Sequence, residues 1–264
     1  MLEQEKINLQ KRVQMIVEKV KNQEKLDCLK SAKSLAKNEY KCSKCRDMLF
    51  IELDDGSFAP CKCRNLRIAE NKLKLSGISE EFRKMRFENF KYESSIEAME
   101  AYVTSKTYSK EFKSIINKKQ NSIMLTGQVG SGKTHLAMAI SNILLDDGKG
   151  VIYMPYRNII TKIKQCITDE ENYQREIIKY KEAQILFIDD LFKGRITESD
   201  INIMYEIIDY RYFKNLPMII TTEKSLSNLL EIDEAIGSRL YEKCKNYTVI
   251  MKGKKLNYRI YEAK

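Results

Sequence analysis

The sequence predicts an α/β fold in which a parallel sheet is sandwiched between helices, together with a smaller module on its N-terminal side. Two observations support this prediction. Short apolar runs, each followed by polar or helical sequence, recur after residue 121, which is typical of buried parallel strands joined by crossover helices. Four of the seven cysteines are clustered before residue 64, ahead of these runs. With 264 residues and 43% apolar content, the chain is long enough for one sizeable core and one small unit.

We expect three segments along the chain. Residues 1–75 are predicted to hold a helix and a cysteine-rich, metal-binding module. Residues 76–120 are predicted to form a linker with one helix, and residues 121–264 the α/β domain.

Two helices are predicted ahead of the α/β domain. In residues 1–39, which contain no proline or glycine, the apolar residues at helical spacing are Leu9, Val13, Ile16, Val17 and Val20. The apolar stripe of such an amphipathic helix either docks a partner protein or covers its own domain. In the linker, one helical face is shared by Ile96, Met99, Tyr102 and Val103.

Four apolar runs have the length of buried strands. They are residues 122–127, 150–155, 184–190 and 217–222. A helical pattern follows the first of them, HLAMAISNILL, so the order strand, loop, helix predicts the parallel connections of an α/β sheet.

The net charge is +10, and most of the excess of lysine and arginine lies in residues 1–90 and 239–264. Basic ends suit a polyanion such as DNA, although a solvated, lysine-rich surface has the same composition. No run approaches the roughly 18 apolar residues of a membrane span, and the N-terminus lacks the apolar region of a secretory signal. We therefore expect a cytoplasmic protein without a membrane partner, whose cysteines stay reduced.

The sequence GQVGSGKT matches the phosphate-binding pattern G-x-x-x-x-G-K-[ST] without a mismatch. Its residues are Gly127, Gln128, Val129, Gly130, Ser131, Gly132, Lys133 and Thr134. The glycines allow successive N–H groups to point at phosphate oxygens, and the following helix adds its positive end. Lys133 is expected to reach the β- and γ-phosphates of ATP or ADP, and the Thr134 hydroxyl to bind Mg²⁺. The next residue, His135, borders this site and is expected to be structural rather than catalytic.

The run ILFIDD ends in two carboxylates. Asp189 is placed to hold Mg²⁺ through water, and Asp190 to orient or deprotonate the water that attacks the γ-phosphate. Many such ATPases carry glutamate at the second position, so the shorter aspartate predicts slow turnover. The alternative is that Asp190 only caps the next loop.

The cysteine cluster has the spacing of a metal site. Its four thiols are those of Cys42, Cys45, Cys61 and Cys63. Zn²⁺ favours four tetrahedral sulfur ligands, and such a site can stabilise a module that is too small for an apolar core. An iron–sulfur cluster, which also takes four thiolates, is the alternative. The remaining cysteines, Cys28, Cys166 and Cys244, are expected to be small buried residues.

With both nucleotide motifs in place, the chain resembles the DnaC/DnaI-type helicase loaders, a branch of the AAA+ ATPases that includes the IstB-like transposition helpers. The resemblance covers about residues 40–262 and rests on the order of several motifs. These are YKCSKC with PCKCR, SGISEEFRKMRFENF, GQVGSGKTHLA, ILFIDDLF, PMIITTE and IDEAIGSRLYEKC. It implies an AAA+ P-loop domain that hydrolyses ATP and self-associates through its ATP sites.

The resemblance also implies roles for single residues. Thr222 is similar to the sensor position that reads the γ-phosphate, although the family often has asparagine one residue later, where this chain has Glu223. Arg239 is similar to the arginine finger that reaches a neighbour's ATP site, the alternative being a surface salt bridge. Arg259 is a further candidate for a phosphate contact.

Three functions are consistent with these features. The first is a loader that places the hexameric replicative helicase of the DnaB family on single-stranded DNA, with residues 1–75 gripping the helicase. The second is an IstB-like transposition helper that coats duplex DNA. The third is a zinc-bearing nucleic-acid-binding protein for which ATP is only a conformational ligand.

Overall fold

The computed structural model describes residues 40–53, 55–64, 67, 76–91, 93, 95–253 and 256–261. The amphipathic helix predicted for residues 1–39 lies outside them. The chain separates into two compact units, Met1–Arg64 and Asn65–Lys264. The predicted segment 76–120 belongs to the second unit together with the α/β domain.

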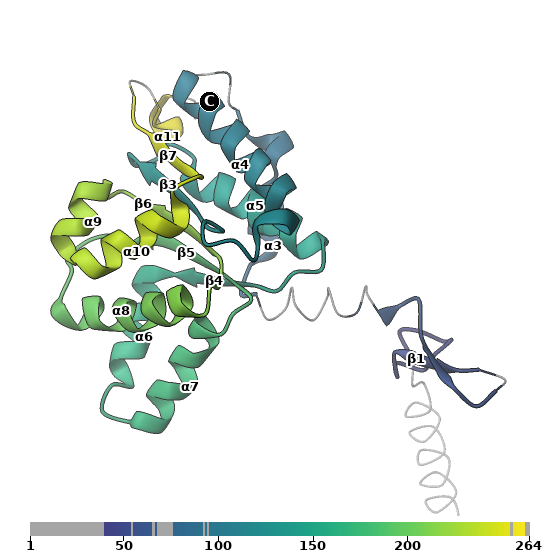
Figure 1. Cartoon of the computed structure of the whole chain (residues 1–264). Coiled ribbons are helices and arrows are strands. Elements are labelled where there is room, and N and C mark those ends of the chain that lie inside the picture. Colours follow the sequence, from purple (N-terminus) through teal and green to yellow (C-terminus); the bar gives the residue numbers. More distant parts are fainter. Residues whose placement is uncertain are drawn as a thin grey trace, which may run out of the picture. The chain divides into compact units, whose positions relative to one another are not determined.

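A five-stranded parallel sheet forms the centre of the second unit (Figure 1). Its strands are β3 (Ile123–Gly127), β4 (Val151–Pro155), β5 (Ile185–Leu191), β6 (Met218–Thr222) and β7 (Thr248–Met251), in the spatial order β4-β5-β6-β3-β7. All four strands expected from the apolar runs are present. β7 was not predicted, because its burial alternates along four residues and leaves only two of them buried.

Helices cover both faces of the sheet (Figure 1). On one face lie α4 (Ile96–Ile115) and α5 (Lys133–Asp146), and α3 (Glu80–Arg83) contacts α5. On the other face lie α6 (Tyr156–Gln165), α7 (Glu170–Lys181), α8 (Glu198–Phe213), α9 (Leu226–Ile232) and α10 (Glu234–Cys244). The short elements η1 (Phe87–Asn89) and α11 (Tyr258–Tyr261) complete the unit.

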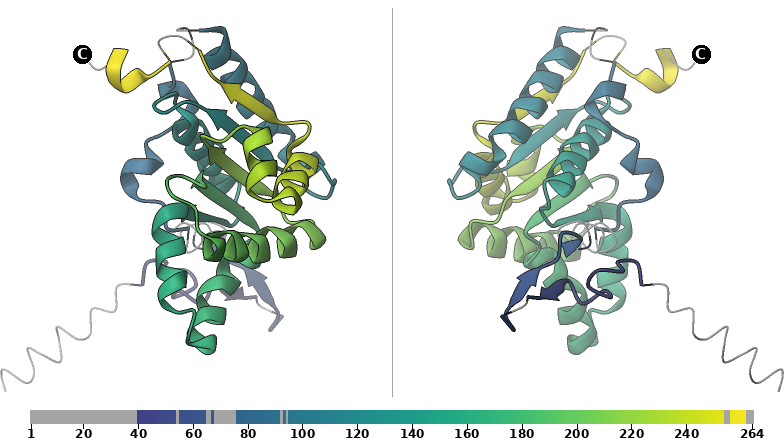
Figure 2. Two further views of the ribbon diagram at one scale, coloured as in Figure 1. Left: turned by 90° about the vertical axis from the view of Figure 1, so that its left-hand side faces the viewer. Right: turned by 90° about the vertical axis from the view of Figure 1, so that its right-hand side faces the viewer.

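Each face of the sheet has its own buried cluster. In β5, Ile185 and Phe187 pack on the α4–α5 side, while Leu186 and Ile188 pack on the α8–α10 side. Successive side chains of a strand point to opposite faces, so burial of both faces explains the unbroken apolar run. Helices α6 and α7 extend past the β4 edge of the sheet, at the end opposite β7 (Figure 2).

Helix α4 is present where a helix was predicted, but of the four residues of its predicted apolar face only Tyr102 packs against the core. Ile96, Met99 and Val103 are 77%, 48% and 54% exposed. The buried side begins instead with the small residues Ala98 and Ala101. Further along α4 the same side carries the buried residues Tyr108, Phe112 and Ile115, so the helix packs through a face that its first residues did not indicate.

The first unit contains a small antiparallel hairpin. Strand β1 (Phe50–Glu52) pairs with β2 (Phe58–Pro60). The side chain of Asp47 accepts hydrogen bonds from the backbone N–H groups of Lys41 and Cys42, at 3.3 and 3.0 Å, and so holds the loop that carries the first cysteine.

Among the described residues, no helix is long and apolar enough to cross a membrane.

Candidate nucleotide and metal sites

The phosphate-binding loop joins β3 to α5 and is shaped by close contacts that only glycine permits. Gly132 has φ +90°, and a Cβ atom there would lie 2.6 Å from Cε2 of Phe90. Gly127 has φ +143°, and a Cβ atom would lie 2.1 Å from the Met251 carbonyl oxygen. The backbone N–H of Gln128 donates to that same oxygen at 3.0 Å. The loop is therefore held in its curled form by neighbouring segments as well as by its own sequence.

Lys133 begins α5 and is 5% exposed. Its ammonium donates to the carbonyl oxygens of Gly127 and Gln128, at 2.9 and 2.6 Å. Burial lowers the pKa of Lys133, while the nearby charges of Glu223 and Asp190 oppose that effect. The ammonium thus lies inside the loop that is expected to surround the phosphates.

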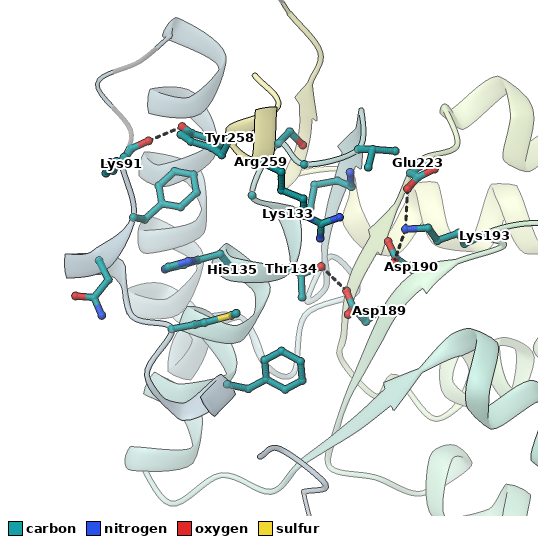
Figure 3. A pocket seen from close by; sticks show the side chains of 18 residues that line it. Lys91, Lys133, Thr134, His135, Asp189, Asp190, Lys193, Glu223, Tyr258 and Arg259 are labelled. Carbon is teal, nitrogen blue, oxygen red and sulfur yellow. Dashed lines mark hydrogen bonds and ion pairs between the residues drawn. The ribbon is translucent and has the colours of Figure 1, made fainter. Parts of the chain in front are cut away.

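Thr134 and Asp189, the two residues expected to bind magnesium, lie beside each other (Figure 3). The Thr134 hydroxyl donates to Asp189 Oδ1 at 2.9 Å. Asp189 also accepts from the hydroxyls of Thr221, at 2.6 Å, and Tyr153, at 3.0 Å. Burial raises the pKa of Asp189, and the hydrogen bonds from Thr221 and Thr134 counteract it. Mg²⁺ in phosphate sites prefers oxygen ligands, and a hydroxyl beside a carboxylate supplies such ligands. Thr134 and Asp189 therefore fit the metal.

Asp190 follows on β5, where the register with β6 shifts. It has φ +58°, an uncommon value for a residue with a side chain. Its backbone N–H donates to the Thr221 hydroxyl at 2.8 Å. Its carboxylate pairs with Lys193 at 2.9 Å, and Lys193 also pairs with Glu223 at 3.0 Å (Figure 3). The Asp190 carboxylate thus borders the same cavity as the phosphate loop and is ion-paired with Lys193.

These groups line one cavity of about 550 Å³, a size suited to a nucleotide. The phosphate loop and the ends of β5 and β6 form one part of its wall. The other part comes from the segments before α4 and after β7, with Phe82, Met85, Asn89, Phe90, Lys91, Tyr258 and Arg259. Arg259, the further candidate for a phosphate contact, is thus brought to the cavity (Figure 3).

His135 also borders the cavity, and its surroundings agree with a structural part. One ring nitrogen lies 2.9 Å from the Arg86 carbonyl oxygen, and the ring meets Phe90 edge-on with centroids 5.4 Å apart. The imidazole therefore ties the segment before α4 to the phosphate loop.

Two residues with roles implied by the family resemblance lie outside the cavity of their own chain. Thr222 is fully buried, and its hydroxyl donates to the Leu191 carbonyl at 2.8 Å and accepts from the Lys224 N–H at 3.1 Å. The cavity is reached instead by the next residue, Glu223. A role for Thr222 as a sensor stays a prediction.

The second of these residues, Arg239, lies on α10. Its guanidinium pairs with Asp209 at 2.7 Å and stands over the rings of Tyr205, Tyr212 and Phe213, 5.2, 5.6 and 5.9 Å from their centroids. It therefore forms a salt bridge, which was the alternative to the finger role, together with three aromatic contacts. A finger role remains a prediction, since it concerns a neighbouring copy.

Several residues of the site were not found from the sequence. Lys193 had a local signal, because a basic residue follows the carboxylate pair after only two positions. Tyr153 and Thr221 had none. They reach Asp189 because β4 and β6 flank β5 in the sheet. Tyr258 comes from the far end of the chain, and its N–H donates to the Gly130 carbonyl at 3.1 Å.

The four clustered cysteines lie together in the first unit. All four sulfur atoms are within 4.8 Å of one another, with Cys42 and Cys61 at 3.8 Å and Cys45 and Cys63 at 3.4 Å. A tetrahedron of sulfurs about 2.3 Å from Zn²⁺ has edges of about 3.8 Å. The four thiols therefore fit zinc. The backbone N–H of Cys45 lowers the pKa of the Cys42 thiol to about 6, which favours the thiolate that binds a metal.

Comparisons with known proteins relate the chain to a family of ATP-binding proteins. A family model described as IstB-like ATP binding protein matches residues 59–260. The phage-like element PBSX protein XkdC of Bacillus subtilis is 34% identical over 235 residues, which cover 84% of this chain and 87% of XkdC. The replicative helicase loader DnaC of Buchnera aphidicola is 29% identical over 138 residues, covering 52% of this chain and 54% of that protein.

A solved structure shares the fold. The crystal structure of the DnaC helicase loader superposes with a TM-score of 0.58 at 22% identity, covering 66% of this chain and all of that one. The expected AAA+ P-loop fold and the resemblance to the loader branch are thereby confirmed.

Proposed function

The chain belongs to the family of IstB-like ATP-binding proteins, and from this premise we propose that it is an ATPase that loads a hexameric DnaB-type helicase onto single-stranded DNA. The ATPase activity is proposed because one cavity of about 550 Å³ is lined by Lys133, Thr134, Asp189 and Asp190. The loader part rests on the likeness to DnaC proteins and on the cysteine unit, Met1–Arg64, which precedes Asn65–Lys264. The second unit is called the ATPase unit after its proposed activity.

The residues around the cavity account for ATP binding and hydrolysis. Thr134 and Asp189 would hold Mg²⁺, which would supply positive charge to the transferring phosphoryl group. Lys133 supplies a buried positive charge on the phosphate side. Asp190 lies beyond Asp189 on β5, where its carboxylate orients a water molecule and accepts its proton. Because Asp190 is engaged by Lys193, basal turnover is expected to be slow.

Arg239 is the residue that suggests self-association of the protein. Within its own chain the guanidinium does not border the nucleotide cavity, and three aromatic rings hold it near the surface of α10. A guanidinium supplied by a neighbour stabilises charge on the phosphoryl group during transfer. We therefore expect protomers to associate through their ATP sites.

The loader function is tested by mixing the full-length protein with its cognate hexameric helicase, with and without ATP, and separating complexes by size. We expect co-elution, strengthened by ATP and by a single-stranded oligonucleotide. The matched control is the Lys133→Ala variant, which should lose the ATP-dependent part only. Absence of a complex under every condition would contradict the loader function and leave the ATPase assignment untouched.

The second candidate is a transposition helper, favoured by the match to the IstB-like family itself. A helper of this kind coats duplex DNA, so a strong preference for duplex over single-stranded DNA, with filaments visible by electron microscopy, would support it. The cysteine unit is an argument for the loader, because a separate metal-stabilised unit suits the gripping of a protein partner.

The third candidate, in which ATP is only a conformational ligand, is separated from the other two by the Asp190→Asn variant. If Asp190 is the base, the variant should bind ATP normally and hydrolyse it about 10²- to 10⁴-fold more slowly than the wild type. Hydrolysis that is undetectable in both proteins, with DNA binding retained, would favour the nucleic-acid-binding protein over an ATPase.

A further inference from the structure

The nucleotide cavity has three carboxylates at the ends of β5 and β6. Asp189, which accepts from the Thr134 hydroxyl, is the one that fits magnesium. The other two, those of Asp190 and Glu223, also line the cavity. A triphosphate is strongly anionic, so carboxylates beside its terminal phosphate repel it unless a cation lies between them. Binding of ATP therefore needs a positive charge from the protein at this end of the cavity.

Lys193 supplies that charge. Its ammonium lies 2.9 Å from Asp190 Oδ2 and 3.0 Å from Glu223 Oε1, and its side chain borders the cavity (Figure 3). Burial would lower the pKa of Lys193, but the hydrogen bonds to Asp190 and Glu223 outweigh it and raise that pKa. An ammonium has three N–H donors. Two of them suffice for the carboxylates, which leaves the third for a phosphate oxygen.

The turn that carries Lys193 is fixed by its neighbours. Asp190 and Phe192 have φ +58° and +57°, and Gly194 follows with φ +90°. Residues with side chains cost free energy in this left-handed region and persist where the surroundings hold them, often at functional sites. Here the Asp190 N–H donates to the Thr221 hydroxyl, and the Phe192 side chain is fully buried. Lys193 is thus mounted between two anchored residues.

Glu223 is likewise held at the end of β6. The hydroxyl of the preceding residue, Thr222, donates to a carbonyl oxygen of β5 at 2.8 Å and accepts from the Lys224 N–H at 3.1 Å. The carbonyl oxygen of Lys224 in turn accepts from the Thr126 hydroxyl of β3 at 2.5 Å. Both residues that flank Glu223 are therefore tied to neighbouring strands, and its carboxylate stays at the cavity wall beside the lysine.

The end of β6 itself offers no donor to a phosphate in this structure. The Thr222 hydroxyl is buried and already donates within the protein. Glu223, at the position where the family often has asparagine, is an acceptor only when ionised. An asparagine amide would donate to an anion, whereas this glutamate pairs with a lysine that can do so. The donor is thus found on the turn after β5 instead of at the end of β6.

The γ-phosphate is expected within reach of this lysine. The phosphate loop binds the phosphates through its N–H groups, and Asp190 is proposed to act on the water that attacks the γ-phosphate. A general base lies within hydrogen-bond distance of the proton it accepts. The γ-phosphate is therefore one water molecule away from Asp190, and an ammonium 2.9 Å from that carboxylate lies beside it.

We propose that Lys193 is the residue of this chain that recognises the γ-phosphate of ATP, and that Glu223 holds the ammonium for this contact. With ATP bound, the ammonium bridges the terminal phosphate and Asp190. With ADP bound, it keeps only its two carboxylate partners. The inference rests on the proposed ATPase function and names the residue by which the site distinguishes ATP from ADP.

The test compares, by calorimetry with Mg²⁺ present, the affinities of the full-length protein for ADP and for a non-hydrolysable ATP analogue. A hydrogen bond between two charged groups contributes about 10-fold or more to an affinity. Lys193→Met should therefore weaken binding of the analogue by about 10-fold or more and leave the affinity for ADP nearly unchanged. Lys193→Arg, which keeps the charge, should restore part of the loss.

The matched control is Lys162→Met. Lys162 also pairs with a carboxylate, that of Glu176, at 2.8 Å, and it does not line the nucleotide cavity. Both affinities of this variant should equal those of the wild type.

A double variant tests the part played by Glu223. Lys193→Met/Glu223→Asn removes the lysine together with the carboxylate that held it, and it places a neutral N–H donor at the end of β6. The double variant should bind the analogue more tightly than Lys193→Met alone, with the same affinity for ADP. A further loss of analogue binding would overturn the pairing of the two side chains as one phosphate contact.

Two outcomes overturn the role of Lys193. In the first, Lys193→Met binds the analogue as tightly as the wild type does. In the second, this variant loses affinity for ADP and for the analogue by the same factor, which would assign Lys193 to the integrity of the site. A wild type that binds neither nucleotide would contradict the proposed ATPase function itself, so the two failures are distinguishable.

Discussion

The cysteine unit and the ATPase unit are stabilised by different interactions. In the described part of the cysteine unit, Cys45 and Cys61 are the buried apolar side chains, whereas Phe50 and Phe58 of the hairpin are exposed. The ATPase unit instead has two large clusters of buried side chains, one on each face of its sheet. A unit without an apolar core depends on its metal ligands, and a unit with two clusters does not. The two should therefore lose their structure independently.

The largest expected effect is the loss of the cysteine unit on removal of zinc. We expect about one Zn²⁺ per chain by metal analysis, and a strong chelator or Cys45→Ser should abolish hydrogen-exchange protection in residues 40–64. Structural zinc contributes an apparent ~10–16 kcal/mol to such units at neutral pH. Cys166→Ser is the matched control, because Cys166 lies outside the cluster. A metal-free protein with a protected hairpin would contradict the comparison.

The next effect concerns the core of the ATPase unit. Phe187 is fully buried on β5, an interior strand of the sheet, so Phe187→Ala should lower the free energy of unfolding of this unit by about 3–5 kcal/mol, measured by denaturant titration with circular dichroism. Phe58→Ala, at a position that is 66% exposed in the hairpin, should change it by less than about 0.5 kcal/mol. Equal effects of the two variants would remove the distinction between the units.

Within the ATPase unit, nucleotide binding should depend on the buried Lys133 and not on the exposed Lys113. Replacing the buried ammonium in Lys133→Ala should weaken ATP affinity by about 100-fold or more, measured by calorimetry, because a desolvated charge then lacks its partner. Lys113→Ala, on an exposed lysine of α4, should bind ATP as the wild type does. Unchanged affinity in Lys133→Ala would remove the phosphate assignment. Metal content should be the same in all three proteins.

The smallest effect is the pH dependence of zinc binding by the cysteine unit. The pKa of Cys42 is lowered from 9.0 to about 6, and the contribution of such a thiol is present above its ordinary pKa and lost as the pH falls through the lowered value. Zinc affinity should therefore fall as the pH is lowered, by about tenfold per pH unit for each proton that zinc displaces. The Cys63 thiol, whose pKa is raised, contributes already above pH 6, and the Cys42 thiol adds its contribution below about 6. Competition with a zinc-binding dye checks this. An affinity that is flat between pH 7 and pH 5 would contradict thiolate ligation.

Much of the nucleotide site could be predicted from short stretches of sequence. The curled loop, Lys133 and Thr134 were predicted because a contiguous pattern of eight residues encodes them, and the strand before and helix after that pattern gave its setting. Asp189 and Asp190 were predicted for the same reason, as the polar end of an apolar run. The four cysteines were predicted from spacing alone, since a metal site needs only donors at suitable intervals.

Other features depended on residues that are distant in sequence. The outward face of α4, with Ile96 and Met99, depends on which side of the helix packs on α5 and the sheet, and the helical periodicity of its first residues does not show that side. The aromatic surroundings of Arg239 require α8 and α10 to pack together. The engagement of the Thr222 hydroxyl by Leu191 requires β5 beside β6.

The amino-acid sequence by itself predicted the groups on which the proposed chemistry rests: a phosphate loop, a carboxylate pair and four clustered thiols. Tertiary structure decided what surrounds these groups. It placed Tyr153 and Thr221 on Asp189, and it placed Lys193 between Asp190 and Glu223. The physical reason is that binding motifs are set by neighbouring residues along the chain, whereas ion pairs and shared cavity walls exist only after the strands and helices have packed.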